Sequence, residues 1–238
     1  MFSPVIPIAG NQPFNDWFVP DTNQRHMLGL RIIAVDPYWG LGTFMYIKSN
    51  DAILKGSLVM WDETMQGALL PTTAGQGFSF GVAMAPIPLG SYGWIQLEGL
   101  AVYKTNSAVA ADTAVAVAAA GIVGTLANGK QLNGVRNRRS ATATTNITFQ
   151  TTNNQGTLFC PKGYDGAFLG MAIPSGSGIP ASAFVAALDA DGHRIYMGSA
   201  IGTLDKVATA TGLVTAACVY TGYGAGVINN PFAQGQIV

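Results

Sequence analysis

Short apolar runs alternate with turn residues along most of the chain, which is the pattern of β-strands. The clearest early runs lie at residues 28–35, 42–48, 57–61, 78–84 and 93–99. Later ones lie at 168–173, 183–188, 194–197 and 213–220. Short strands with turn signals roughly every 8–12 residues are typical of a barrel or sandwich. We therefore expect an all-β protein with a compact, barrel-like first domain.

One stretch is ambiguous between helix and strand. Residues 108–120, AVAADTAVAVAAA, are rich in alanine, which favours helix. Val115 and Val117 nevertheless alternate with small residues, and the stretch lacks the charged face that an amphipathic surface helix presents. We expect a turn near Asp112 followed by a strand, with a short helix as the alternative.

Composition shifts divide the chain into four parts. Residues 1–37 carry five prolines and several aromatics and predict an extended arm, which either docks on another surface or packs along the protein's own core. Residues 38–140 form the expected first β domain, and the Thr- and Asn-rich residues 141–157 an expected linker. Residues 158–238 are the expected second β-rich part. Asp191-Gly192 and Asn128-Gly129 are hairpin-turn signals.

The charge content narrows the possible partners. The chain has 12 basic and 12 acidic residues among 238, so the formal net charge is zero. Without a basic excess to neutralise phosphates, we expect no nucleic-acid partner. The longest apolar run, Ala114–Gly124, is shorter than the ~20 residues of a membrane span, so we expect no membrane partner. A surface with so few charges suits a protein that works bound to others or to copies of itself.

The cysteines and histidines predict no cofactor and no metal. Cys160 and Cys218 are too few for a disulfide framework; we expect two free, buried thiols, with a single bridge as the open alternative. His26 and His193 have no Cys or His at ligand spacing, so we expect surface or partly packed imidazoles. Asp189 to Gly192 could begin a calcium loop, but the rest of such a loop is missing, and a turn is the better interpretation.

Three further motifs look catalytic, but each lacks a required neighbour. Gly77 to Gly81 matches a nucleophile elbow around Ser79, but the following Val-Ala-Met-Ala-Pro cannot form the helix that an elbow needs. Gly124 to Lys130 begins like a phosphate-binding loop, and Gln131 stands where Ser or Thr should hold magnesium. Gly176 to Ala181 resembles a dinucleotide fingerprint but contains Pro180. We therefore predict no catalytic residues and no enzyme.

Residues 44–101 resemble the small capsid cement, or head decoration, proteins of tailed phages. The matching features are the strand Phe44-Met-Tyr-Ile-Lys48, then Gly81-Val-Ala-Met84, then Gly90-Ser-Tyr-Gly-Trp-Ile-Gln-Leu-Glu-Gly99. The likeness continues loosely through Gly121 and Gly134, so that it covers about residues 40–140.

The resemblance implies a compact β-tulip-like domain, usually trimeric, on the outer surface of the capsid, where it would bridge major capsid subunits. The family-motif positions Gly81, Tyr92, Gly93 and Trp94 would be core or oligomer positions. The aromatics Phe14, Trp17 and Phe18 would be the capsid contacts of the arm. The major capsid protein and further copies of the chain would be the partners, and the mature location would be the virion.

Two other classes remain open on sequence alone. A phage tail, fibre or head-spike protein that binds a receptor or glycan would also be a Gly- and Thr-rich β chain. Its candidate stacking residues are Trp39, Trp61, Trp94 and Tyr223, although core packing is the favoured interpretation for Trp61 and Trp94. A hydrolase that uses Ser79 is the third class.

Overall fold

The computed structural model describes residues 3–4, 19–36, 40–74, 77–106, 109–139, 144–162, 171–189, 193–199, 203–220 and 223–233. Every regular element in these ranges is a β-strand, which confirms the all-β class. The chain forms two compact units. Unit 1 comprises residues 1–141 and 222–238, and unit 2 comprises residues 142–221.

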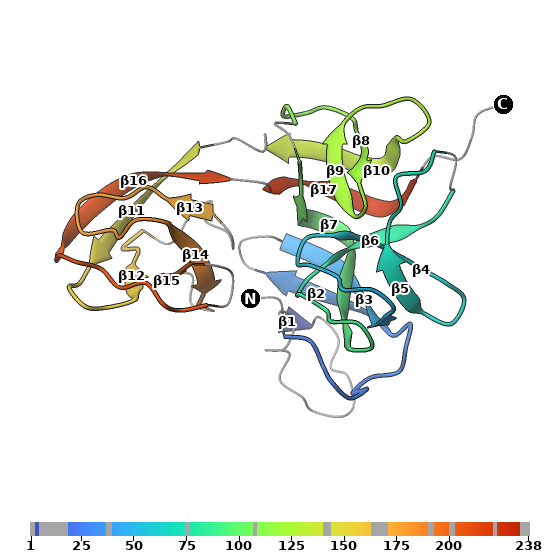
Figure 1. The fold of residues 1–238 in the computed structure, drawn as a ribbon, viewed down its shortest axis with the longest axis horizontal. Coiled ribbons are helices and arrows are strands. Elements are labelled where there is room, and N and C mark those ends of the chain that lie inside the picture. Colours follow the sequence, from blue (N-terminus) through green and yellow to red (C-terminus); the bar gives the residue numbers. More distant parts are fainter. Residues whose placement is uncertain are drawn as a thin grey trace. The chain divides into compact units, whose positions relative to one another are not determined.

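Unit 1 holds a nine-stranded sheet in the order β1-β2-β3-β5-β4-β6-β7-β17-β10, together with a separate β8–β9 hairpin (Figure 1). Its strands are β1 (Ser3–Pro4), β2 (Arg31–Asp36), β3 (Gly40–Ser49), β4 (Leu58–Trp61), β5 (Gln66–Leu69), β6 (Phe80–Ala83), β7 (Tyr92–Lys104), β8 (Val115–Ala119), β9 (Ile122–Thr125), β10 (Leu132–Arg139) and β17 (Tyr223–Ala233).

A second pairing of β3, with β7, closes five of these strands into a ring. Because β3 pairs with both β5 and β7, the path β3-β5-β4-β6-β7 returns to its start. The ring encloses an apolar cluster to which each strand contributes; its residues include Met45, Ile47, Val59, Ala83, Ile95 and Leu97. The barrel-like character expected for residues 38–140 therefore arises from this ring.

The alanine-rich stretch at 108–120, for which both a strand and a short helix were considered, contains strand β8, which pairs with β9 as a hairpin. A turn at Ala111-Asp112 precedes β8, and Val115 and Val117 are buried in a cluster that also contains Tyr103 and Val135. Propensity alone favours helix, but two β-branched side chains on one strand face fill this core. Asn128-Gly129 does form a turn, but it is not a hairpin, because β10 pairs with β17 instead of β9.

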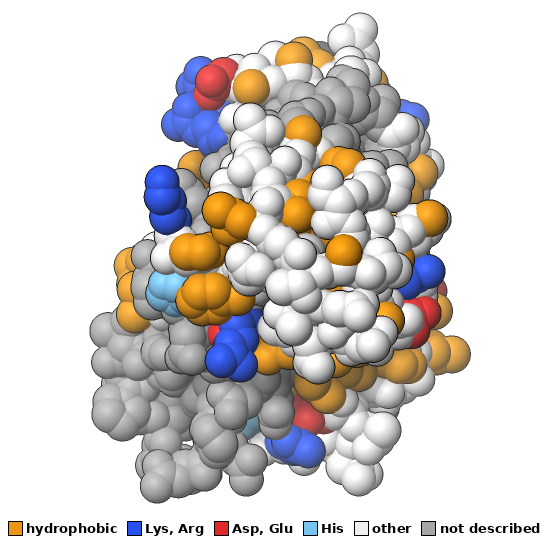
Figure 2. Space-filling view, turned by 90° about the vertical axis from the view of Figure 1, so that its left-hand side faces the viewer, with side chains coloured by type: hydrophobic (Ala, Val, Ile, Leu, Met, Phe, Trp, Pro, Cys, Tyr) orange, Lys and Arg blue, Asp and Glu red, His pale blue; other side chains and the backbone are white. Residues whose placement is uncertain are grey.

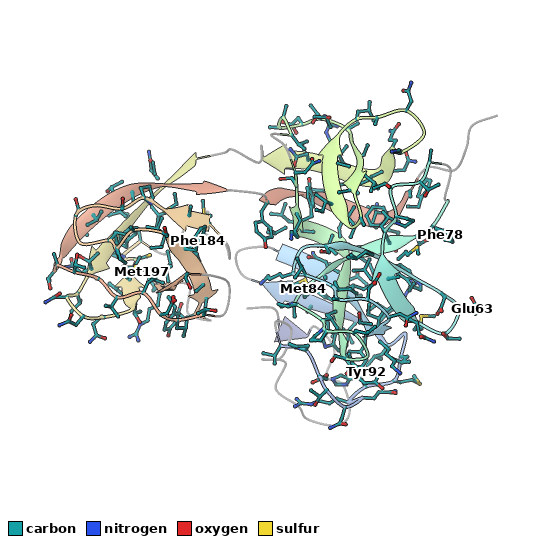
Figure 3. All side chains as sticks on the ribbon, in the orientation of Figure 1. Glu63, Phe78, Met84, Tyr92, Phe184 and Met197 are labelled. Carbon is teal, nitrogen blue, oxygen red and sulfur yellow. The ribbon has the colours of Figure 1, made fainter. Side chains whose placement is uncertain are left out.

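Unit 2 is a closed barrel in the order β11-β12-β15-β14-β13-β16 (Figure 1). Its strands are β11 (Thr144–Thr151), β12 (Thr157–Phe159), β13 (Met171–Ile173), β14 (Ala183–Leu188), β15 (Arg194–Gly198) and β16 (Gly212–Tyr220). Alternate side chains point inward, among them Met197, which Figure 3 labels. The barrel interior also holds Cys160 and Cys218, both free and buried as expected.

The boundaries expected from the sequence differ from these units. The expected linker at 141–157 contains β11 and the start of β12, because Ile147 and Phe149 alternate with threonines and fill the barrel interior. The expected C-terminal part, 158–238, is divided, because β17 returns to unit 1 and pairs with β7 and β10. Unit 2 is thus an insertion between two neighbouring antiparallel strands of unit 1.

Candidate functional site

An aromatic cluster lies around Tyr46, where the N-terminal segment meets the sheet. Tyr46 comes from β3, and Tyr92 and Trp94 come from β7. The Tyr46 ring stacks on Tyr92 at a centroid distance of 6.1 Å and lies 5.1 Å from Trp94. His26 packs edge-on to Tyr46 at 5.0 Å, and its ring centroid is 5.3 Å from that of Trp94. Figure 3 shows Tyr92 at the end of unit 1 where the chain after residue 19 runs.

A buried carboxylate completes this cluster. The Tyr46 hydroxyl donates a hydrogen bond to Oδ2 of Asp21 at 2.7 Å, and Arg25 Nε lies 3.0 Å from the other carboxylate oxygen. Only 7% of the Asp21 side chain is accessible, whereas half of the Arg25 side chain is. Burial, and next the hydrogen bond to Asp21, raise the pKa of Tyr46 well above its usual value. The phenol therefore stays protonated and acts as a structural donor.

Backbone hydrogen bonds fasten the same segment to the sheet. Asp21 and Tyr92 exchange both N–H···O bonds at 2.8 Å, and Tyr46 pairs with Gly29 and Leu30. Of the two interpretations of the arm, packing along the protein's own core is the one that holds for residues 19–36. The aromatics Phe14, Trp17 and Phe18, expected to contact the capsid, lie outside the described residues.

The family-motif positions fall in the unit 1 core. Trp94 is buried in the cluster around Tyr46, and Tyr92 packs against its edge. A Cβ on Gly81 would lie 2.9 Å from the Gln96 carbonyl oxygen, and one on Gly93 would lie 2.7 Å from Ile87. These glycines therefore allow neighbouring chain to approach closely. Trp61 is half-buried against the ring core and Tyr223 is half-buried, while Trp39 lies outside the described residues.

The residues of the apparent catalytic motifs do not assemble into a site. Ser79 is exposed just before strand β6 and forms a backbone bridge with Phe232. Residues 126–130, at the end of the phosphate-loop match, form a turn, with no helix N-terminus beside them. His193 is exposed and stacks on Phe159, and Asp189 accepts backbone hydrogen bonds from His193 and Arg194. Among the described residues, no group of three His, Cys, Asp or Glu side chains could hold a metal ion.

Lys55 has a lowered pKa that was not predicted from the sequence. Its Nζ atom is buried, and desolvation lowers the pKa of the ammonium group to about 7. It lies in the turn before β4, where Gly56 N–H donates a hydrogen bond to the Ala83 carbonyl and the Gly56 carbonyl accepts one from Lys104 N–H. Sequence around Lys55 resembles an ordinary polar turn, so only the packing of the neighbouring strands could show this burial.

An exposed apolar strip crosses four strands of the unit 1 sheet. It consists of Ile33 and Val35 on β2, Leu41 on β3, Leu100 on β7 and Val227 on β17. Val35 lies opposite Leu41 and Val227 opposite Leu100, and directly opposed residues share a sheet face. Four of the five are 41–60% exposed, and Leu100 is half-buried. Glu98 and Arg136, which lie opposite Asn229 and Val227, give the strip a polar margin.

Comparisons with known proteins found no match to a protein-family model, a curated protein or a solved structure. Within the described residues there is no helix long and apolar enough to cross a membrane.

Proposed function

We propose that the chain is a structural virion protein that binds the outer surface of a phage capsid as an oligomer, a trimer being the expected state. In that position it would cement neighbouring major capsid subunits and would need no turnover. The likeness of residues 44–101 to capsid cement proteins suggests the location. The exposed strip is the observation that supports an oligomer.

The strip has the make-up of a contact between protein subunits. Apolar side chains lie at its centre, and the charged Glu98 and Arg136 lie at its margin, as in the apolar core and polar rim of many interfaces. Burial of these side chains against a second copy would remove apolar surface from water, at about 25 cal/mol per Å². Subunits joined in this way would present several capsid contacts at once, which raises the overall affinity without a stronger single contact.

Two charge substitutions in the strip test this proposal. Leu41→Asp and Val227→Asp place a carboxylate at the centre of the proposed contact, and Leu126→Asp is the control, since Leu126 is 56% exposed but outside the strip. Mass measured by light scattering should give an oligomer for the parent and for Leu126→Asp, and monomers for both strip variants. A monomeric parent, or strip variants that stay oligomeric, would refute the strip as the subunit contact.

A further inference from the structure

The outward face of the unit 2 barrel carries a row of residues suited to ligand binding. Leu213, Gln150, Phe159 and Arg194 are successive cross-strand partners on β16, β11, β12 and β15. Because directly opposed residues point to the same face, the four side chains form one line across the barrel wall. Phe159 is 46% exposed and Leu213 is 66% exposed.

The surroundings of this row are polar and nearly free of charge. Thr148 and Thr215, on the next outward positions, share a hydrogen bond of 2.8 Å between their hydroxyls. Thr157 and Tyr196, another opposed pair, are half-buried on the other side of the row. Among the described outward-facing side chains of these four strands, Arg194 is the one that carries a charge. Figure 2 shows mostly white atoms with scattered hydrophobic side chains in the middle of this view, and several Lys, Arg, Asp and Glu side chains around them.

The Phe159 ring packs against a neighbouring imidazole. The His193 imidazole stacks on it, with centroids 6.2 Å apart and planes 20° apart. The backbone of His193 is fixed in turn, because its carbonyl accepts a 2.7 Å hydrogen bond from Cys160 N and its backbone N–H donates to Asp189 Oδ1. A platform fixed in this way loses little freedom when a ligand binds, which favours affinity.

We propose that this surface binds an uncharged carbohydrate chain, with Phe159 as the stacking platform. The C–H face of a sugar ring is apolar and can lie on an aromatic ring, while its hydroxyls both donate and accept hydrogen bonds. The Gln150 amide supplies a donor and an acceptor, and the planar Arg194 guanidinium supplies paired donors. The inference rests on unit 2 alone and does not depend on the proposed virion role.

The same features disfavour the other classes of ligand. A nucleic acid needs several cations to replace its counterions, and the described outward-facing side chains of these four strands include one. A peptide that binds as an added strand needs an open sheet edge, and these strands belong to a closed barrel. A large protein interface usually has an extended apolar centre, whereas only Phe159 and Leu213 are large exposed apolar side chains in this row.

Ligand-observed NMR on the intact chain tests the inference. The probes are three neutral oligosaccharides, namely maltotriose, cellotriose and an N-acetylglucosamine trimer, with a sulfated heparin oligosaccharide for comparison. We expect saturation transfer to at least one neutral oligosaccharide. Phe159→Ala should weaken binding about fivefold or more, in line with the loss of one stacking contact. Gln150→Ala, which leaves the barrel interior intact, should also weaken it.

The control is Phe78→Ala, since Phe78 is a similarly exposed phenylalanine of unit 1, labelled in Figure 3. It should bind like the parent. Protection of the buried Cys160 and Cys218 thiols checks that each variant keeps its barrel folded. The inference is overturned if no neutral oligosaccharide binds, if only the sulfated one binds, or if Phe159→Ala and Gln150→Ala, both folded, bind like the parent.

Discussion

The Tyr46 hydroxyl donates a 2.7 Å hydrogen bond to Asp21, a residue 25 positions earlier, in a buried setting. This bond joins the segment before β2 to β3, which belongs to the five-stranded ring and also pairs with β2. The segment is thereby part of unit 1, so its removal should disturb the fold as well as any partner contact.

Tyr46→Phe and Asp21→Ala should each destabilise unit 1. A buried hydrogen bond to a charged group contributes about 1.5–3 kcal/mol, and a double-mutant cycle should return a coupling energy in that range. All four tryptophans, at positions 17, 39, 61 and 94, lie in unit 1, so denaturant unfolding followed by their fluorescence reports this unit. Tyr92→Phe keeps a stacked ring and is the control. Coupling below about 0.5 kcal/mol would show that the bond is incidental.

Lys55 should make unit 1 more stable as pH rises above neutrality. Its folded pKa, about 7, lies below the usual 10.5, so between these values the unfolded chain binds more protons than the folded one. The free energy of unfolding then increases with pH, by at most about 1.4 kcal/mol per unit. Lys55→Met should raise stability at pH 7 and flatten the profile from pH 7 to 9, whereas Lys48→Met should keep the slope. An unchanged slope in Lys55→Met would contradict this assignment.

Unit 2 should respond to pH in the opposite sense. Burial raises the pKa of both the Cys160 and Cys218 thiols from 9.0 to about 12. The stability that unit 2 gains from keeping both thiols protonated is complete below pH 9. It is lost as pH rises toward 12, because the unfolded chain ionises its thiols first. Both cysteines lie in unit 2, so their rate of modification reports its opening. Cys218→Ala should remove about half of the pH dependence. Thiolate absorbance that appears near pH 9 in the folded protein would argue against buried thiols.

Removal of unit 2 should leave unit 1 folded. Arg139 of β10 lies opposite Ala225 of β17, so the two ends of the insertion meet at neighbouring strands. A four-residue Gly- and Asn-containing loop in place of residues 140–222 can join such strands, and loop tips tolerate insertions of this kind. Tryptophan emission and the thermal midpoint of unit 1 should be close to those of the full chain. A shortened chain that fails to fold would show that the two units depend on each other.

Local signals in the sequence located most strands but could not assign them to units. Short apolar runs between turn residues identified the strands near 42–48, 93–99 and 183–188, although residues 44–47 and 93–97 are buried on both faces. The return of β17 to unit 1 depends on pairing with β7 across more than a hundred residues, which no local pattern encodes. Tyr92 and Trp94 were identified as motif residues, whereas Asp21, which pairs with Tyr92 across 71 positions of the chain, and the buried Lys55 were not.

The exposed row of side chains on unit 2 could not be predicted from the sequence either. Phe159 and Leu213 lie far apart in the chain, and only the barrel register brings them into one line through Gln150. The stacking residues expected for a glycan-binding protein were tryptophans and a tyrosine of unit 1. Trp94 is buried, in agreement with core packing, the interpretation favoured for it from the sequence.

The proposed virion role is most directly tested by counting this chain in purified particles of the phage that encodes it. Quantitative mass spectrometry would give its ratio to the major capsid protein. We expect a fixed ratio that survives repeated purification, and density for an oligomer on the outer shell in particle images. A chain that is absent from such particles, and that is found only as a free monomer, would contradict it.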